Sequence, residues 1–265
     1  MDIMSLIGLL GAAGLMFYGM VDGGSADNFI SASSVAITVG GTFAALMITF
    51  PLKVFVSIPK LLAKVFLPRI YDFDPQKYVS YLYEIAYYAK KDGILSVEEK
   101  IPEYKDGFLR KAVQLAVDSE PPENIREIME TELGYMIERH KSVIKFFEKG
   151  AIFAPGFGML GTLAGLINML MQAQDPIGIT RGMAGALVTT FYGLILANVI
   201  FLPIGNKLQK RSDGEVLCRQ LTIEGIISVL NGETPLQIQG KLISYIPPHM
   251  RNLEKIRRRI GEEEA

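Results

Sequence analysis

Apolar residues along this chain are gathered into four long blocks, separated by polar segments. The blocks cover residues 3–21, 33–51, 151–171 and 178–203. A bilayer core of about 30 Å is crossed by about 20 residues of helix, and lipid offers the backbone no hydrogen-bond partners. Each block therefore predicts a membrane-spanning helix. The predicted fold class is all-α: a polytopic membrane protein with four transmembrane helices and a helical cytoplasmic domain.

The segment after the second block carries helix signals of its own. Residues 57–71 have a one-sided apolar pattern, which predicts a short amphipathic helix along the inner membrane surface. The dipeptide Asp74-Pro75 predicts a helix start, and Gly93 its end. Ser96, with Glu99 three residues later, forms a capping-box pattern that predicts another helix start.

Two further helices are predicted to continue the third and fourth spans. Pro121-Pro122 begins a helical pattern that runs to Lys149 and on into the third block. The fourth span continues through residues 204–230 and is broken at Asn231-Gly232. Thr234-Pro235 then predicts a short helix near the C-terminus.

Basic residues set the predicted orientation of the spans. Of the 27 Lys and Arg residues, 15 lie in residues 56–149 and 10 in residues 204–265. Because excess basic residues stay on the cytoplasmic side of a membrane, both segments and both termini are expected to be cytoplasmic. Short turns are then all that the chain exposes outside.

The expected organisation follows from these spans and their orientation. It comprises residues 1–55 as transmembrane helices one and two, 56–149 as a cytoplasmic helical loop domain, 150–203 as transmembrane helices three and four, and 204–265 as cytoplasmic C-terminal helices.

Composition excludes several classes of function. Hydrophobic residues make up 49% of the chain and the mean hydropathy is +0.27, which is too apolar for an ordinary soluble protein. A net charge of −1 provides no basic field for nucleic acid. Cys218 is the single cysteine, and the two histidines, His140 and His249, are far apart in sequence, so we expect no metal site.

One glycine run resembles a nucleotide-binding motif. Gly156, Gly158 and Gly161 spell G-x-G-x-x-G, but that fingerprint needs a preceding strand, and here it lies inside an apolar block. Gly161 and Gly165 instead form G-x-x-x-G, a small-residue face that lets two helices approach closely in lipid. No pattern in the chain points to nucleophilic catalysis, and we do not expect an enzyme.

Polar residues inside the predicted spans are few and mostly hydroxyls. They are Thr38, Thr42, Thr49, Thr162, Asn168, Thr189, Thr190, Tyr192 and Asn198. The ordinary role of such a threonine is a hydrogen bond to its own i−4 carbonyl or to a neighbouring helix. Ion paths usually contain a membrane carboxylate, and none of the four blocks contains Asp, Glu or Lys. If this chain moves ions, a second protein must supply the carboxylate.

Four segments resemble the MotA/PomA family of flagellar motor stator proteins, within the MotA/TolQ/ExbB proton channel family. They are APGFGMLGTLAGLI at 154–167, ALVTTFYG at 186–193, FLPIGNKL at 201–208 and AKKDGILSVE at 89–98. The resemblance covers essentially the whole chain, including the four-span order and the large loop.

The resemblance implies a complex rather than a self-sufficient channel. Five such subunits are expected to surround two copies of a MotB-type single-span partner, whose membrane Asp takes up the ion. The transported H⁺ or Na⁺ then drives the ring, and no other cofactor is expected. The cytoplasmic loop is expected to push on the rotor switch protein. The expected location is the bacterial inner membrane, in contact with lipid.

Residue roles carry over by matching motifs. Pro155 and Pro203 match two prolines tied to torque generation and ion gating. Thr162 and Thr190 match threonines of the ion path, with Thr189 as a neighbour. Some sodium-type members keep the hydroxyl at the position of Thr162 and many proton-type members have Ala, but exceptions occur, and we favour protons.

Two charged residues match the family's rotor contact. Glu98 matches its acidic member, and Lys90 lies where the family commonly has Arg. Lysine keeps the positive charge but loses the planar fork of a guanidinium, so long-range attraction remains while a bidentate contact is lost. From the residues alone, a solvated charged surface would be the ordinary interpretation.

Two alternatives compete with the motor. A TolQ/ExbB-like energiser of envelope proteins shares the ring and the single-span partner, but generally has three spans. A self-contained transporter would need its own charged or broken-helix site at mid-membrane. The four blocks, Glu98 and Pro203 favour the motor.

Overall fold

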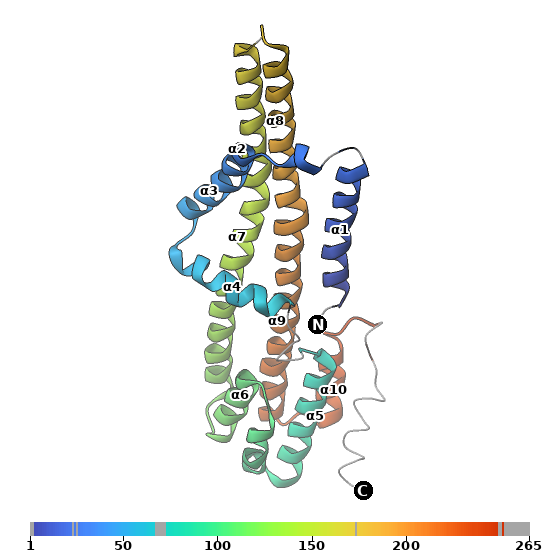
Figure 1. Cartoon of the computed structure of the whole chain (residues 1–265). Coiled ribbons are helices and arrows are strands. Elements are labelled where there is room, and N and C mark those ends of the chain that lie inside the picture. Colours follow the sequence, from blue (N-terminus) through green and yellow to red (C-terminus); the bar gives the residue numbers. More distant parts are fainter. Residues whose placement is uncertain are drawn as a thin grey trace. The chain divides into compact units, whose positions relative to one another are not determined.

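A computed structural model describes residues 3–22, 24, 26–66, 73–172, 174–248 and 251, and every regular element in these ranges is a helix (Figure 1). The α-helices are α1 (Ile3–Asp22), α2 (Ala32–Val35), α3 (Gly41–Thr49), α4 (Leu52–Phe66), α5 (Pro75–Asp92), α6 (Gly107–Val117), α7 (Pro122–Met171), α8 (Pro176–Ile195), α9 (Leu202–Leu230) and α10 (Pro235–Ile243). Two 3₁₀ helices, η1 (Ala26–Phe29) and η3 (Ile94–Glu103), and two π-helical turns, η2 (Ala36–Gly40) and η4 (Leu196–Phe201), complete the set.

The chain forms two compact units. Residues 1–69 and 140–209 make the first, and residues 70–139 and 210–265 make the second. Helices α7 and α9 contribute residues to both units.

Three helical stretches among the described residues are long and apolar enough to cross a bilayer. They are Ala32–Thr49, Pro122–Met171 and Pro176–Leu230. The last two contain the third and fourth predicted spans, and the first corresponds to the second predicted span, residues 33–51, but ends at Thr49. The first predicted span folds as the 20-residue helix α1, in which Leu10–Asp22 is the described apolar stretch. The all-helical fold with membrane-spanning helices is therefore present, and the fourth crossing stays a prediction.

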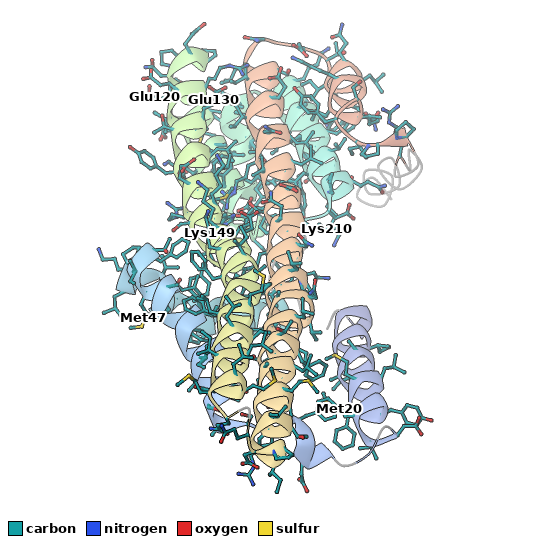
Figure 2. The ribbon with its side chains drawn as sticks, turned by 90° about the horizontal axis from the view of Figure 1, so that it is seen from above. Met20, Met47, Glu120, Glu130, Lys149 and Lys210 are labelled. Carbon is teal, nitrogen blue, oxygen red and sulfur yellow. The ribbon has the colours of Figure 1, made fainter. Side chains whose placement is uncertain are left out.

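Helix α7 is one continuous element of 50 residues, as the uninterrupted pattern after Pro122 predicts. Pro122 lies at its start, where a missing N–H costs nothing, and Pro155 lies in its interior. Figure 2 shows nitrogen and oxygen atoms gathered along the part of the helix between Glu120 and Lys149, with mostly carbon beyond. One helix therefore combines a charged segment with an apolar one.

The fourth span also continues without a break, through α8, η4 and α9. The Asp175 carboxylate caps its start by accepting from the Ile177 amide at 3.0 Å. Its end follows the sequence signal, since α9 stops at Leu230 and Gly232 adopts φ 78°, a conformation that favours glycine.

An aromatic cluster holds one end of the first unit together. The ring of Phe146 on α7 lies 5.5 Å from Phe50 and 5.1 Å from Phe55, measured between centroids. The Phe201 ring of η4 packs on Phe147 at 6.2 Å and also rests on Gly150, where a Cβ would lie 2.4 Å from the ring. Glycine at position 150 thus allows α7 and η4 to pack closely.

The second unit has a conventional aliphatic core. Helices α5 and α6, with the parts of α7 and α9 that belong to this unit and α10, bury Val79, Leu82, Ile85, Ala112, Val113, Ile125, Met129, Leu221, Ile226, Ile238 and Leu242. Helix α5 starts as predicted, with the Asp74 carboxylate accepting from the Gln76 amide at 3.1 Å. Helix α10 begins with a capping box between Thr234 and Gln237.

The structure differs from two of the predicted helix signals, those at Ser96 and at residues 57–71. The capping box at Ser96 is wrong, because Ser96 lies inside η3 and its hydroxyl donates to the Gly93 carbonyl at 2.7 Å instead of accepting from a helix start. The amphipathic helix predicted over residues 57–71 corresponds to α4, which begins earlier, at Leu52. Its predicted apolar face lies outside the described side chains.

Candidate functional site

Small residues bring α7 and α8 into close contact. A Cβ at Gly161 would lie 2.7 Å from Thr189 Cγ2, and one at Gly165 would lie 2.9 Å from Ala186 Cβ. From the other side, a Cβ at Gly193 would lie 2.7 Å from the Ala154 carbonyl oxygen. The predicted small-residue face is confirmed, and the G-x-G-x-x-G run lies wholly within α7, where it cannot bind a nucleotide phosphate.

The close contact pairs two of the predicted ion-path residues. The hydroxyls of Thr162 and Thr190 are within hydrogen-bond distance of each other. Thr162 Oγ1 also lies 3.0 Å from the Gly158 carbonyl and 3.1 Å from the Ala186 carbonyl. Because a hydroxyl has one proton, Thr162 can donate to only one of these acceptors at a time. Both threonines are half-buried, so the pair stays accessible from one side of the helix contact.

Thr189, the third predicted residue, is buried beside the pair. Its hydroxyl can donate to the Ala186 carbonyl at 2.7 Å or to the Gly185 carbonyl at 3.2 Å, both on its own helix. Ala186 is therefore an acceptor shared by Thr162 and Thr189. Thr189 supports the pair through this shared carbonyl.

Thr38 joins the same cluster from the second span. It is fully buried, and its hydroxyl donates to the Thr189 carbonyl at 3.3 Å. The Thr42 hydroxyl in turn donates to the Thr38 carbonyl at 2.6 Å. Thr38 is one of the polar residues of the predicted spans, but it is not among the three that the motifs assign to the ion path. Its position in the π-helical turn η2 is a tertiary feature that no motif marks.

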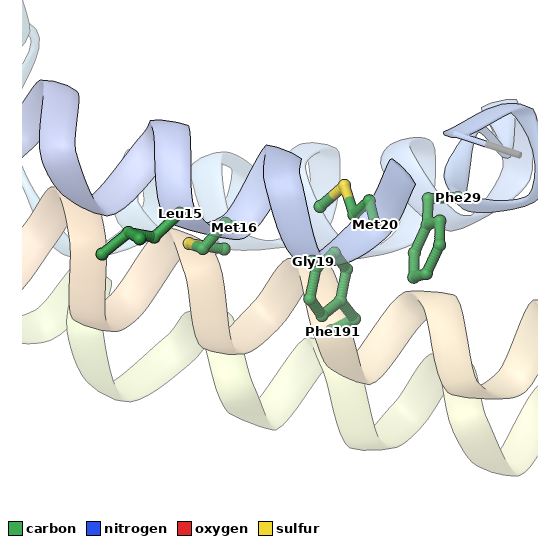
Figure 3. Close-up of a pocket in the computed structure, with 6 residues that line it drawn as sticks. All are labelled: Leu15, Met16, Gly19, Met20, Phe29 and Phe191. Atoms are coloured by element: carbon green, nitrogen blue, oxygen red, sulfur yellow. The ribbon is translucent and has the colours of Figure 1, made fainter. Parts of the chain in front are cut away.

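The other polar span residues remain apart from this cluster or at its outer end. Thr49 donates to the Ala45 carbonyl and Asn198 to the Leu194 carbonyl, each within its own helix. The Tyr192 hydroxyl donates to the Phe29 carbonyl, tying the first connection to α8. An adjacent groove is lined by Leu15, Met16, Gly19, Met20, Phe29 and Phe191 (Figure 3). These side chains carry no charged group, so the groove is no ion site.

The two predicted gating prolines lie within the long helices. Pro155 sits in α7 about two helical turns before Thr162, and Gly193 of α8 packs against its backbone. Pro203 is the second residue of α9, immediately after η4, and is exposed. A proline cannot donate to the carbonyl four residues earlier, so Ala151 and Val199 each lose a helical partner. The helices are thereby softened at both places.

The chemistry available at the threonine pair is that of neutral oxygens. Hydroxyl and carbonyl oxygens can replace the hydration shell of a small cation or pass a proton along, but they do not store charge. Among the described residues, no group of three His, Cys, Asp or Glu could hold a metal ion. An ion path built on this pair therefore needs an acidic group from another chain.

The predicted contact residues Lys90 and Glu98 lie in the second unit. Lys90 belongs to the last turn of α5, and Glu98 belongs to η3, which follows directly. Both side chains are exposed. The structure thus puts opposite charges on neighbouring elements, and their role stays a prediction.

An ion-pair network ties three helices of the second unit together. Glu224 of α9 pairs with Lys241 of α10 at 2.5 Å and with Arg126 of α7 at 3.3 Å. These partners, Lys241 first, hold the pKa of Glu224 below its ordinary value, and the same carboxylate raises the pKa of Lys241. In the same unit, burial raises the pKa of Tyr78, whose hydroxyl donates to Asp106 at 2.8 Å. The unit is thus held by charge as well as by its core.

Comparison with known proteins agrees with this architecture. Residues 100–220 match the model of the MotA/TolQ/ExbB proton channel family. Motility protein A of Treponema pallidum is 38% identical over 95% of this chain and 96% of its own, and the chemotaxis protein PomA of Vibrio alginolyticus is 34% identical over 96% and 99%. In the flagellar MotAB stator complex from Bacillus subtilis, a chain that is 32% identical superposes with a TM-score of 0.84 over 93% of this chain and 96% of that one.

The all-helical fold with membrane-spanning helices defines the class: a helical membrane protein. The chain belongs to the motility protein A family, within the MotA/TolQ/ExbB proton channel family. Its function is that of a flagellar motor stator protein.

Proposed function

We propose that this chain acts with a MotB-type single-span partner, and that the two together form the ion channel that drives the flagellar rotor. The observation that carries the proposal is the Thr162–Thr190 pair, a polar contact between spans that contain no Asp, Glu or Lys. A path lined only by hydroxyls and carbonyls needs a titrating acid, and a membrane Asp of the partner would supply it.

The assembly follows from the same requirement. Five copies of the chain surround the partner in the bacterial inner membrane, each crossing it four times with both termini in the cytoplasm. The lopsided distribution of Lys and Arg supports this orientation. The largely exposed apolar faces of the three long helices support contacts with lipid and with other copies.

In this mechanism the ion passes beside the threonine pair and drives movement at the softened helices. Pro155 and Pro203 permit the bending, and the second unit transmits it to the rotor switch protein through Lys90 and Glu98. The transported ion is H⁺, as the family's description supports. The flagellar names of the relatives favour this mechanism over a TolQ/ExbB-like energiser.

The test removes single hydroxyls without changing side-chain shape. In cells that express the chain with its MotB-type partner, we expect Thr162→Val and Thr190→Val each to reduce swimming speed. Because the two hydroxyls form one contact, the double variant should lose little more than either single variant.

Thr49→Val is the matched control. It removes a hydroxyl that bonds only within its own helix, and we expect normal swimming. Wild-type speed in both Thr162→Val and Thr190→Val would contradict the proposed path. The same assay at several Na⁺ concentrations, with and without a proton uncoupler, assigns the coupling ion.

A further inference from the structure

The segment that carries Glu98 is an unusual helix. η3 runs as a 3₁₀ helix for 10 residues, from Ile94 to Glu103. Runs of 3₁₀ helix longer than three or four residues are uncommon because their hydrogen bonds have poor geometry. A helix of this length must therefore be held by contacts outside itself.

The 3₁₀ geometry sorts the side chains of η3 into rows. With three residues per turn, residues i and i+3 lie directly above one another. One row contains Ile94, Val97 and Lys100, and Val97 is fully buried in the core of the unit. Leu95 and Glu98 form the start of another row, and both are exposed, Leu95 by 66%. The helix therefore presents an apolar and an acidic side chain on one line.

Lys100 fastens the inward row to α5. Its Nζ lies 3.0 Å from Glu84 Oε1 and 3.9 Å from the centre of the Tyr88 ring. Glu84 and Tyr88 are four residues apart on α5 and so lie on the same face, with the ammonium group in contact with both. The Lys100 and Glu84 side chains are only 20% and 11% exposed, so solvent screens this pair less than an ordinary surface pair.

A second contact reinforces the same junction. The Ser96 hydroxyl lies within reach of the Tyr88 carbonyl at 3.3 Å and of the Gly93 carbonyl at 2.7 Å. Gly93, between the two helices, has φ 87°, which lets the chain turn sharply from α5 into η3. These contacts join η3 to α5, and η3 also packs on α6.

We propose that Lys100 is the positioning residue of the rotor-contact surface. It holds η3 on α5 and so fixes the exposed row of Leu95 and Glu98 that meets the rotor switch protein. The inference rests on the proposed function, in which Glu98 contacts the rotor. The row fits a partner surface with a basic side chain beside an apolar depression. Such a contact has an apolar centre and a charged rim, as stable protein interfaces do.

The contacts of Lys100 predict how its loss would act. In Lys100→Met a side chain of similar length remains, but the buried Glu84 carboxylate loses its cation. Leaving a buried carboxylate unpaired is costly, and its natural relief is movement of η3 away from α5 toward water. Glu98 would then remain present but be misplaced.

The experiment is a double-mutant cycle in complete motors, with torque per stator unit measured on a bead attached to one flagellum. Lys100→Met should lose torque to about the same extent as Glu98→Gln, and the double variant should lose no more than Glu98→Gln alone. A merely structural role would give losses that multiply. Lys100→Arg keeps a cation over the tyrosine ring and should retain most of the torque.

A matched control and a second readout guard against a general folding defect. Lys111→Met removes another ion pair of the same unit, with Glu132 at 2.6 Å, and should leave torque unchanged. Amide hydrogen exchange of the purified complex should accelerate in residues 94–103 of Lys100→Met but not in α10. If Lys100→Met fails to assemble, Glu84→Gln disturbs the same junction and takes its place.

The outcomes separate this inference from the proposed function. Unchanged torque in Glu98→Gln and Glu98→Lys would overturn the rotor contact itself. Impaired torque in the Glu98 variants, together with normal torque in Lys100→Met, would overturn only the positioning role. Losses that multiply in the double variant would overturn it as well.

Discussion

At the scale of single residues, a glycine, which has no Cβ, decides whether two membrane helices can share a polar contact. Gly161 leaves room for Thr189, and the neighbouring Thr162 then reaches Thr190 across the gap. Close packing of backbones is what drives association in lipid, where the hydrophobic effect is absent. The threonine pair therefore depends on its glycine neighbours as much as on its own hydroxyls.

We predict opposite effects for two glycine substitutions in α7. In Gly161→Ala the new methyl would lie 2.7 Å from Thr189 Cγ2, and overpacking of this kind costs about 1–3 kcal/mol. At Gly156 a Cβ meets nothing within 4 Å, and alanine is favoured over glycine in a helix by about 1 kcal/mol. Thermal unfolding of the purified complex should fall for Gly161→Ala and hold or rise for Gly156→Ala. Equal melting temperatures would contradict the close approach.

At the scale of elements, the long helices combine rigidity with local soft points. The fourth span contains the π-helical turn η4 directly before Pro203, and the second span contains the turn η2. Such turns are frequent at functional sites because their hydrogen bonds can shift between registers. A helix with one soft point can bend there and still transmit force along its length.

Pro203→Ala tests whether this soft point is used. Alanine restores an amide that can donate to the Val199 carbonyl, so the helix should become more regular and more stable. We expect swimming speed to fall while the melting temperature of the complex holds or rises. A loss of both would indicate misfolding, and normal swimming would mean that bending at Pro203 is not needed. Video tracking and calorimetry give the two readouts.

The ion-pair network of the second unit predicts acid sensitivity. The folded-state pKa of Glu224 is lowered from 4.5, so its stabilising effect is complete above that value and is lost as pH falls through the folded-state pKa. Glu224→Gln removes this effect, so it should lower stability at neutral pH and flatten the dependence of stability on pH below 4.5. Urea unfolding of the wild-type and Glu224→Gln complexes at several pH values, monitored by hydrogen exchange in α10, measures this difference in stability. Parallel pH profiles for both proteins would contradict it.

At the scale of the whole molecule, the central feature is that the four predicted spans contain no acidic residue. They contain no Asp, Glu or Lys, and their one charged residue is Arg181 near the start of the fourth span, so the chain offers a surface beside which another protein's acid can titrate. The apolar faces of the long helices are largely uncovered within one chain. Both features belong to a subunit of an assembly.

We therefore predict that the purified chain alone, reconstituted in vesicles without a partner, conducts no ions. Co-reconstitution with its MotB-type partner should produce flux that a pH-sensitive dye inside the vesicles reports. The complex that carries Thr49→Val serves as the positive control. Substantial flux from the chain alone would require a charge-carrying site of its own and would refute the proposal that the partner supplies the titrating acid.

Local signals in the sequence predicted much of the fold. Asp74, Pro122, Gly232 and Thr234 act through their own backbone neighbours, and the helix starts and ends that they predict are present. Ser96 shows the limit of such signals. Its capping pattern does not form a helix start, because the segment is a 3₁₀ helix. Lys100 contacts α5 and Val97 is buried in the core, and these contacts hold the segment in place.

The sequence by itself determined where the apolar helices lie, that they carry no Asp, Glu or Lys, and which family they resemble, because hydropathy and motifs are properties of short segments. Only the tertiary structure decided which threonines meet. Thr162 and Thr190 are brought together, Thr38 joins from another span, and Thr49 stays apart. Those contacts depend on how closely helices that are distant in sequence approach one another. The atoms that face Gly161 and Gly193 fix this approach, and no local sequence pattern encodes it.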